Sequence, residues 1–190
     1  VAVADVDLGG RGRRALAVAH RELEQPASGH VGHERRARAV SAGDVVVGSR
    51  LIGQFFVRPD YFHSRPSATD PFYDASASGA SNLAPSNAKL LEQAQNRVRR
   101  IQKENGLPVG APAPADLALT SASGLDPHIS LASAWLQAPR IAAQRNLPIA
   151  DIETLIRKNI EPPLLGIWGK ERINVLQLNL ALDEIKTSKR

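Results

Sequence analysis

The sequence has 190 residues, of which 43% are hydrophobic but only 4% aromatic, so we expect a globular domain with a mainly aliphatic core. It contains no cysteine, which excludes disulfides, cysteine–zinc sites and thiol nucleophiles. The formal net charge is +5, but the basic residues are not interleaved with aromatic ones, so nucleic acid is not expected as a partner.

Residues 1–43 differ in composition from the rest of the chain. They are rich in arginine, alanine and glycine and hold three of the five histidines, His20, His30 and His33. The histidine spacing is not a convincing set of metal ligands, and the longest apolar run is too short to cross a membrane. We therefore expect an irregular, solvated tail without a metal site, followed by a separate domain over residues 44–190.

Two segments of different texture open this domain. Residues 44–56 are apolar and β-branched with glycine breaks, which predicts one or two strands around a turn. Residues 58–87 are dense in proline, serine, glycine and asparagine, which predicts a long loop. Four of the six Phe and Tyr residues lie in this loop, and aromatic side chains anchor loops by burial. We expect the loop to be ordered and packed.

Helices dominate the remainder of the chain. The first is expected to begin after Asn87, with apolar residues at helical spacing, and to end at Asn105 and Gly106. The other predicted helices cover residues 130–144, residues 149–159 and the residues from Asn174 onwards.

A short strand is predicted over residues 116–121, after a proline-rich connector. The elements together predict an α+β fold, with a small mixed sheet from the 44–57 and 116–121 regions against three or four helices. In the last helix we expect Asn174, Gln177 and Asn179 at the edge of an amphipathic stripe rather than in buried contacts.

Residues 123–130 form the sharpest motif, and it has two interpretations. Ser123, Gly124 and Ser130 beside a helix N-terminus could offer backbone N–H groups to a phosphate. Alternatively, Gly124 permits a tight turn and Asp126 or Ser130 caps the helix. No phosphate-loop lysine is present, and Asp126 would repel phosphate, so the motif favours local structure.

His128 stands beside Asp126 and several serines, which is the composition of a hydrolase triad. The nucleophile motif Gly-x-Ser-x-Gly is absent from the sequence, and a histidine at a helix start is more often a surface residue. No catalytic residue is therefore predicted.

Three blocks of sequence, spread over residues 45–183, form a pattern that is specific in its order and spacing. They are GSRLIGQ at 48–54 with RPSA at 65–68, SGASN at 78–82 and PSN at 85–87; TSASGLDPHIS at 120–130 with PRIA at 139–142; and NVLQLNLALD at 174–183. Through these blocks the chain resembles the C subunit of the bacterial Kdp potassium-transporting ATPase.

The resemblance implies an accessory subunit of an ATP-driven potassium import pump, not an enzyme by itself. The implied partners are a catalytic subunit, which carries the phosphorylated aspartate and the nucleotide site, and a channel-like subunit. The implied location is the bacterial inner membrane, reached through the complex. Family members begin with a transmembrane helix, and residues 1–43 contain nothing like it.

The resemblance also suggests site residues. No intrinsic cofactor is expected, but ATP is a candidate ligand, because a nucleotide role proposed for the family points to the position of Gln137. Contacts with the other subunits are expected from loops 58–87 and from the 123–137 region. The candidate contact residues are Tyr61, Phe62, Arg65, Pro66, Ser81, Asn82, Asp126 and His128. The alternative function is a free-standing soluble nucleotide-binding module that modulates an ATPase.

Overall fold

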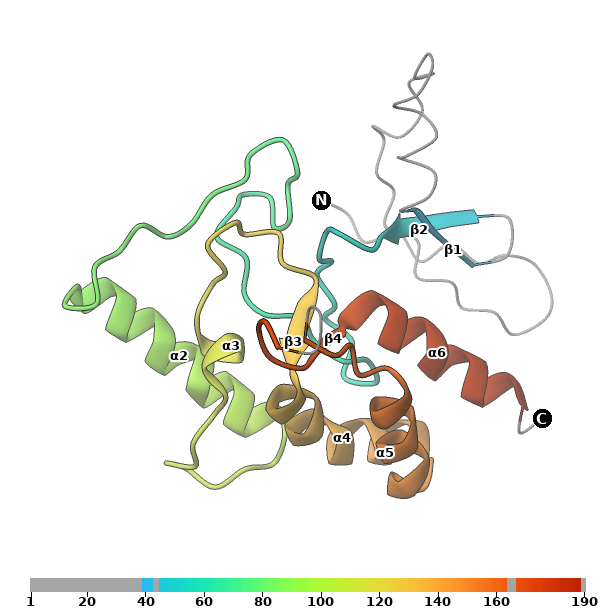
Figure 1. The fold of residues 1–190 in the computed structure, drawn as a ribbon. Coiled ribbons are helices and arrows are strands. Elements are labelled where there is room, and N and C mark those ends of the chain that lie inside the picture. The colour runs from blue at the N-terminus through green and yellow to red at the C-terminus, as the bar shows by residue number, and fades with distance from the viewer. Residues whose placement is uncertain (1–38, 43–44, 164–166, 189–190) are drawn as a thin grey trace, which may run out of the picture.

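The computed structural model describes residues 39–42, 45–163 and 167–188 of the chain. In these ranges the strands form two separate antiparallel pairs: β1 (Ala39–Ala42) with β2 (Val45–Ser49), and β3 (His128–Ser130) with β4 (Arg172–Asn174). The β3–β4 pair lies at the centre of the molecule, whereas the β1–β2 hairpin lies at its periphery (Figure 1).

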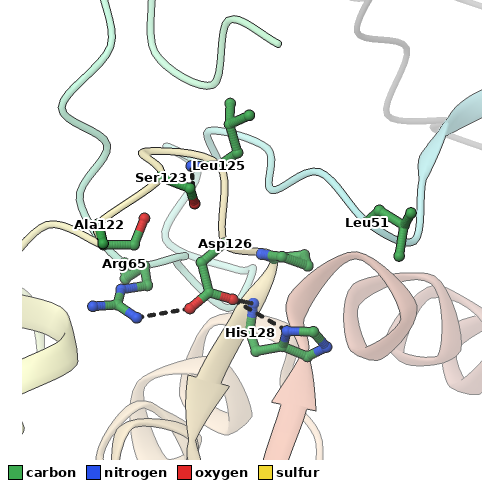
Figure 2. A pocket seen from close by; sticks show the side chains of 9 residues that line it. Leu51, Arg65, Ala122, Ser123, Leu125, Asp126 and His128 are labelled. Atoms are coloured by element: carbon green, nitrogen blue, oxygen red, sulfur yellow. Dashed lines mark hydrogen bonds and ion pairs between the residues drawn. The ribbon is translucent and has the colours of Figure 1, made fainter. Parts of the chain in front are cut away.

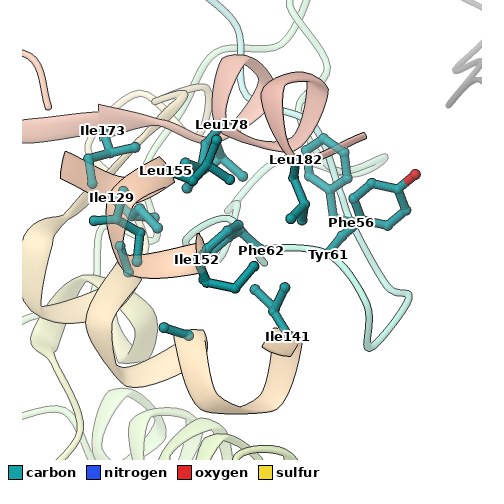
Figure 3. Close-up of a cluster of buried hydrophobic side chains, with 14 of the residues drawn as sticks. Phe56, Tyr61, Phe62, Ile129, Ile141, Ile152, Leu155, Ile173, Leu178 and Leu182 are labelled. Carbon is teal, nitrogen blue, oxygen red and sulfur yellow. The ribbon is translucent and has the colours of Figure 1, made fainter. Parts of the chain in front are cut away.

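The described helices are α2 (Ala88–Glu104), α3 (Ala115–Ala118), α4 (Leu131–Arg145), α5 (Ile149–Lys158) and α6 (Val175–Ser188). Two helices, α4 and α6, pack on the central strand pair, and α5 packs on these two helices. Side chains from α4, α5, α6, the two strands and the loop around residue 60 form most of the core (Figure 3). Its completely buried members include Phe62, Ile141, Ile152, Ile156, Ile173, Leu178 and Leu182. Each such side chain contributes about 1.5–3 kcal/mol through burial, so these elements hold the domain together.

The segment between β2 and α2 contains no helix or strand, yet two side-chain amides fix it against the core. In α6, Asn179 accepts a hydrogen bond from the backbone N–H of Phe62 (2.9 Å) and donates one to its carbonyl (3.0 Å). In α4, Gln137 accepts from the backbone N–H of His63 (2.8 Å) and donates to its carbonyl (3.2 Å). We call Asn179 and Gln137 the amide clamps. They take the place of a neighbouring strand for a backbone that has none.

The α+β class is confirmed, as are the helices predicted from Asn87, over 130–144, over 149–159 and from Asn174. Ser130 accepts the capping bond of α4 from the backbone N–H of Ser133 (3.2 Å), which is the cap that the sequence offered. The packed loop is also confirmed, because Tyr61, Phe62 and Tyr73 are at most 3% exposed.

The single mixed sheet is wrong in detail. Residues 116–121 do not form a strand, since residues 115–118 form the short helix α3, and β2 pairs with β1 instead. Leu117 and Ala118 are adjacent and both buried, which is possible for one turn of helix but not for the alternating faces of a strand.

The predicted edge position of the last helix's amides is also wrong for two of the three. Asn174 and Asn179 are each 2% exposed and fully engaged in hydrogen bonds, and Asn174 both caps α6 and donates to the carbonyl of Arg50 (2.8 Å). Gln177 is half-buried, as an edge residue should be.

Residues 39–42, the last part of the predicted tail, form β1. Residues 1–38, which include His20, His30 and His33, lie outside the described residues, so the division into 1–43 and 44–190 stays a prediction. Over the part of the chain that the structure describes, no helix combines the length and apolar character that a membrane crossing needs.

A capping prediction arises at α2. Asn87 accepts a hydrogen bond from the backbone N–H of Lys89 (2.9 Å), and few residues of this helix are buried. Asn87→Ala is expected to lower the free energy of unfolding by about 1 kcal/mol, because it leaves an N-terminal donor without its partner. Urea unfolding measures the change, and Ser86→Ala at the exposed neighbouring position is the control. Equal stability of the two variants would contradict the capping role.

Candidate functional site

Three loop segments that are distant in sequence meet on one face of the domain. The backbone N–H of Gly53 donates to the carbonyl of Leu125 (2.8 Å), and that of Gly79 donates to the carbonyl of Ser123 (2.9 Å). Gly124 has φ +70°, and a Cβ on it would lie 2.7 Å from the carbonyl oxygen of Gly79. Only glycine fits both the backbone conformation and the space there. The tight-turn interpretation of Gly124 is thereby confirmed.

A hydroxyl and a phenol tie the same loops together. Ser67 donates to the carbonyl of Gly124 (2.7 Å) and accepts from the backbone N–H groups of Thr69 and Tyr73. The Tyr73 hydroxyl donates to the carbonyl of Arg65. These hydrogen bonds hold the backbone around Arg65 in place, so the three loops form a defined surface.

A chain of charged and titratable side chains crosses this surface. Arg65 pairs with Asp126 (2.7 Å), and the two ring nitrogens of His128 lie 3.1 Å from Asp126 and 3.3 Å from Glu161. Glu161 also pairs with Arg172 (3.2 Å). Figure 2 shows Arg65, Asp126 and His128 side by side. Among the described residues, the contacts found for the His128 ring are to the carboxylates of Asp126 and Glu161.

Arg65, Asp126 and His128 line a shallow depression, which we call the junction surface. Its lining residues are Leu51, Arg65, Ser121, Ala122, Ser123, Leu125, Asp126, Pro127 and His128. Leu51, which is 54% exposed, adds an apolar side chain to this lining. The junction surface thus offers both charge and apolar area to a partner.

The Asp126 carboxylate makes the stability of this surface depend on pH. Burial alone would raise the pKa of Asp126, but hydrogen bonds from His128 and from Arg65 outweigh burial and lower the pKa to about 2. An unfolded aspartate titrates at about 3.9, so the ionised group stabilises the fold above that pH, and the stabilisation is lost as pH falls towards 2.

We therefore expect Asp126→Asn to flatten the pH dependence of unfolding in this window. Between about pH 4 and pH 2, the free energy of unfolding of the unaltered protein should fall more steeply than that of the variant. Urea unfolding at stepped pH measures both slopes. Glu92→Gln, at an exposed site on α2, is the matched control. Parallel slopes for the unaltered protein and Asp126→Asn would contradict the assignment.

The four predicted nucleotide residues do not come together at one site. Ser123 and Gly124 belong to the loop junction, whereas Ser130 lies at the start of α4. There the carboxylate of Asp116 accepts from the backbone N–H of Ser130 (2.7 Å) and from the hydroxyls of Ser130 (3.0 Å) and Ser133 (2.7 Å). A protein carboxylate thus occupies the place at the helix N-terminus that a phosphate would take.

Gln137, the fourth predicted nucleotide residue, is 1% exposed. Its oxygen accepts from His63 and from Arg140 (2.8 Å each), and its nitrogen donates to the carbonyls of His63 and Ser133. All of its hydrogen-bonding capacity is used within the chain. Its evident role in this structure is that of an amide clamp.

The predicted subunit-contact residues fall into two groups. Arg65, Pro66, Asp126 and His128 are partly exposed on or beside the junction surface, and Ser81 and Asn82 follow in the adjoining loop. Tyr61 and Phe62 are 2% and 0% exposed and belong to the core, so their side chains are not offered to another subunit.

Sequence reasoning missed Asp116, Glu161 and Leu51. Asp116 was placed in a strand, and Glu161 lies 33 residues after its partner His128, with no motif to join them. Among the described residues, no group of three or more histidine, cysteine or acidic side chains could hold a metal ion.

Comparison with known proteins supports the resemblance that the three sequence blocks indicate. The family model for the c chain of the K+-transporting ATPase matches residues 26–184. A potassium-transporting ATPase KdpC subunit of Cereibacter sphaeroides is 52% identical over 138 residues, or 73% of this chain and 71% of that protein. The Yersinia pestis subunit is 46% identical over 167 residues, or 87% and 79%, and the Mycobacterium bovis subunit is 49% identical over 140 residues, or 74% of each. The chain therefore belongs to the KdpC family and is a non-catalytic, accessory subunit of a potassium-transporting ATPase.

Proposed function

We propose that this chain binds the catalytic and channel-like subunits of an ATP-driven potassium import pump through its junction surface, and thereby assists assembly and stability of the complex. The observation that carries the proposal is the construction of that surface. Three loops without regular secondary structure are fixed by buried hydrogen bonds, and yet they leave Leu51 and a chain of charges accessible. Rigid loops of this kind are the usual location of recognition residues.

The location follows from the partners. A subunit held by membrane-embedded partners resides at the plasma membrane, the bacterial inner membrane, and needs no crossing helix within the described residues to do so. ATP stays a candidate ligand in this proposal. Its predicted position at the start of α4 is disfavoured, because Asp116 holds the donors there and Gln137 is engaged elsewhere. The structure accordingly favours the accessory subunit over the free-standing nucleotide-binding module.

Co-purification tests the proposal directly. The tagged chain is co-expressed with the other subunits of the potassium-transporting ATPase, and the amount of each that is retained is measured. Leu51→Asp is expected to reduce retention about tenfold, because it replaces an apolar side chain of the junction surface with a charge that burial under a partner would leave unpaired.

The control variant is Val109→Asp, which introduces the same group at a site that is 98% exposed in the connector before α3. It should retain the partners as well as the unaltered chain does. Equal retention by both variants would mean that the junction surface is not the interface, and no retention by the unaltered chain would remove the proposed function.

A further inference from the structure

A second pocket lies between α2 and the loop that holds residues 55–72. It has a volume of about 190 Å³, and its lining includes Phe55, Phe72, Arg97, Arg100 and Ile101. Unlike the lining of the junction surface, the lining of this pocket includes aromatic rings beside its arginines. Neither the fold nor the junction surface accounts for the exposure of these rings beside arginines.

Two aromatic rings remain in solvent here. The rings of Phe55 and Phe72 are 4.8 Å apart, and the side chains are 43% and 54% exposed. The four other Phe and Tyr residues of the chain are all at most 5% exposed. An exposed pair of phenylalanine rings in contact with each other marks a surface that gains from being covered.

One arginine of this pocket, Arg97, has no counterion among the described residues. Arg97 is half-buried, and it donates to the carbonyl of Ala118 (3.0 Å) but pairs with no carboxylate among the described residues. Burial lowers the pKa of Arg97. Other charges at the pocket are compensated, because Arg100 pairs with Glu104 (2.6 Å) and Arg65 pairs with Asp126. A partly desolvated cation without a partner costs free energy that a bound anion would offset.

We propose that this pocket receives an acidic segment of another pump subunit, with a carboxylate paired to Arg97 and an apolar side chain laid against Phe55 and Phe72. This proposal rests on the proposed function, since it takes the occupant from the same complex. It adds a second contact with the complex, on the α2 side of the domain. Charge complementarity selects the acidic segment, and the ring pair selects its apolar neighbour.

Photo-crosslinking in the assembled complex tests the proposal. Phe72→p-benzoylphenylalanine is introduced into the full chain, which is co-expressed with the other subunits, irradiated and purified. Mass spectrometry then identifies the crosslinked segment. The expected product joins this chain to a stretch of another subunit that contains aspartate or glutamate. In the same background, Arg97→Gln should lower the crosslink yield about tenfold or more, as the loss of a buried charge partner does.

The matched control is Arg99→Gln, which removes the same charge from an exposed position two residues along the same helix. Its crosslink yield should be unchanged. Equal losses in the two variants would show that the positive charge of the helix attracts the partner without a specific pair at Arg97, which would overturn the proposal. A complex that co-purifies intact but gives no crosslink, or a crosslink to a segment without acidic residues, overturns this proposal alone. A chain that fails to co-purify overturns the proposed function and this proposal with it.

A small anion is the remaining occupant, and calorimetry with ATP separates it from a protein segment. ATP binding to the isolated chain that Arg97→Gln abolishes and Arg99→Gln preserves would assign the pocket to a nucleotide and overturn the proposal.

Discussion

Arg145→Met is expected to lower the free energy of unfolding by about 3 kcal/mol, the lower end of the range for removing one partner of a buried ion pair. The Arg145 side chain is 3% exposed and donates to the carboxylate of Asp183 (2.8 Å) and to the carbonyl of Asp60 (2.7 Å). It also lies 4.6 Å from the centre of the Tyr61 ring. One guanidinium thus joins the end of α4, the last helix and the loop around residue 60.

Methionine preserves much of the packing volume but satisfies none of these acceptors. Asp183 would keep its hydrogen bonds from the Tyr61 hydroxyl (2.9 and 3.1 Å) and lose its cation. Asp183 is one-third exposed, and solvent therefore moderates the loss. Arg99→Met, at an exposed position on α2, should change stability by less than about 0.5 kcal/mol.

Urea unfolding of both variants measures the difference, and the Arg145→Met midpoint should fall by about 1–2 M for ordinary denaturant slopes. A midpoint equal to that of the Arg99→Met control would show that Arg145 contributes no more than a surface charge.

The parts of the fold that sequence could predict are those set by local rules. Asn87 and Ser130 are capping residues followed by helical periodicity, and both helices begin where the sequence indicates. The left-handed conformation of Asn146, with φ +52°, ends α4 in the same predictable way. Each of these signals is contained within a few neighbouring residues.

The strand predicted within residues 44–56 is present as β2, but the strand pairings could not be predicted, because the partners are distant or weakly marked. β3 and β4 are three residues each and lie more than forty residues apart, so neither carries the alternating pattern that identifies a strand. The apolar segment after Asp116 predicted a strand, but the Asp116 carboxylate accepts hydrogen bonds at the N-terminus of α4, and the backbone forms a helical turn. Tertiary contacts overrule local preference at both places.

The candidate sites divide along the same line. The sequence identified Arg65, Asp126 and His128 through the family blocks, and they do come together, but their joining requires a contact across 61 residues. The pocket beside Arg97 could not be predicted from the sequence, because an arginine on a helix is normally expected to be exposed to solvent. What a charged residue lacks, in this case a counterion, is visible only in three dimensions.

Asn179→Leu is expected to lower the free energy of unfolding by about 3 kcal/mol, because it leaves both the N–H and the carbonyl of Phe62 buried without a partner. Leucine is close to asparagine in size, so lost packing contributes little. Gln177→Leu makes the matching amide-to-leucine change at a half-buried position on the same helix, and its side-chain amide makes no hydrogen bond found among the described residues. Urea unfolding should show a large loss in the first variant and a small change in the second.

A matching substitution at Gln137 distinguishes a structural role of this residue from a role in nucleotide binding. If Gln137 is an amide clamp, Gln137→Leu should lower the free energy of unfolding by about 2–3 kcal/mol with or without ATP, since His63 and Arg140 lose their partner. The control is Gln144→Leu at an exposed position of α4, which should be nearly neutral. Equal stability of these two variants, together with ATP binding that only Gln137→Leu abolishes, would contradict the clamp and restore Gln137 to a ligand site. If Gln137→Leu causes a large loss of stability, the loop backbone at His63 has lost its hydrogen bonds to Gln137. Weakened pump function in that variant would then result from this change in the loop and not from lost ATP binding.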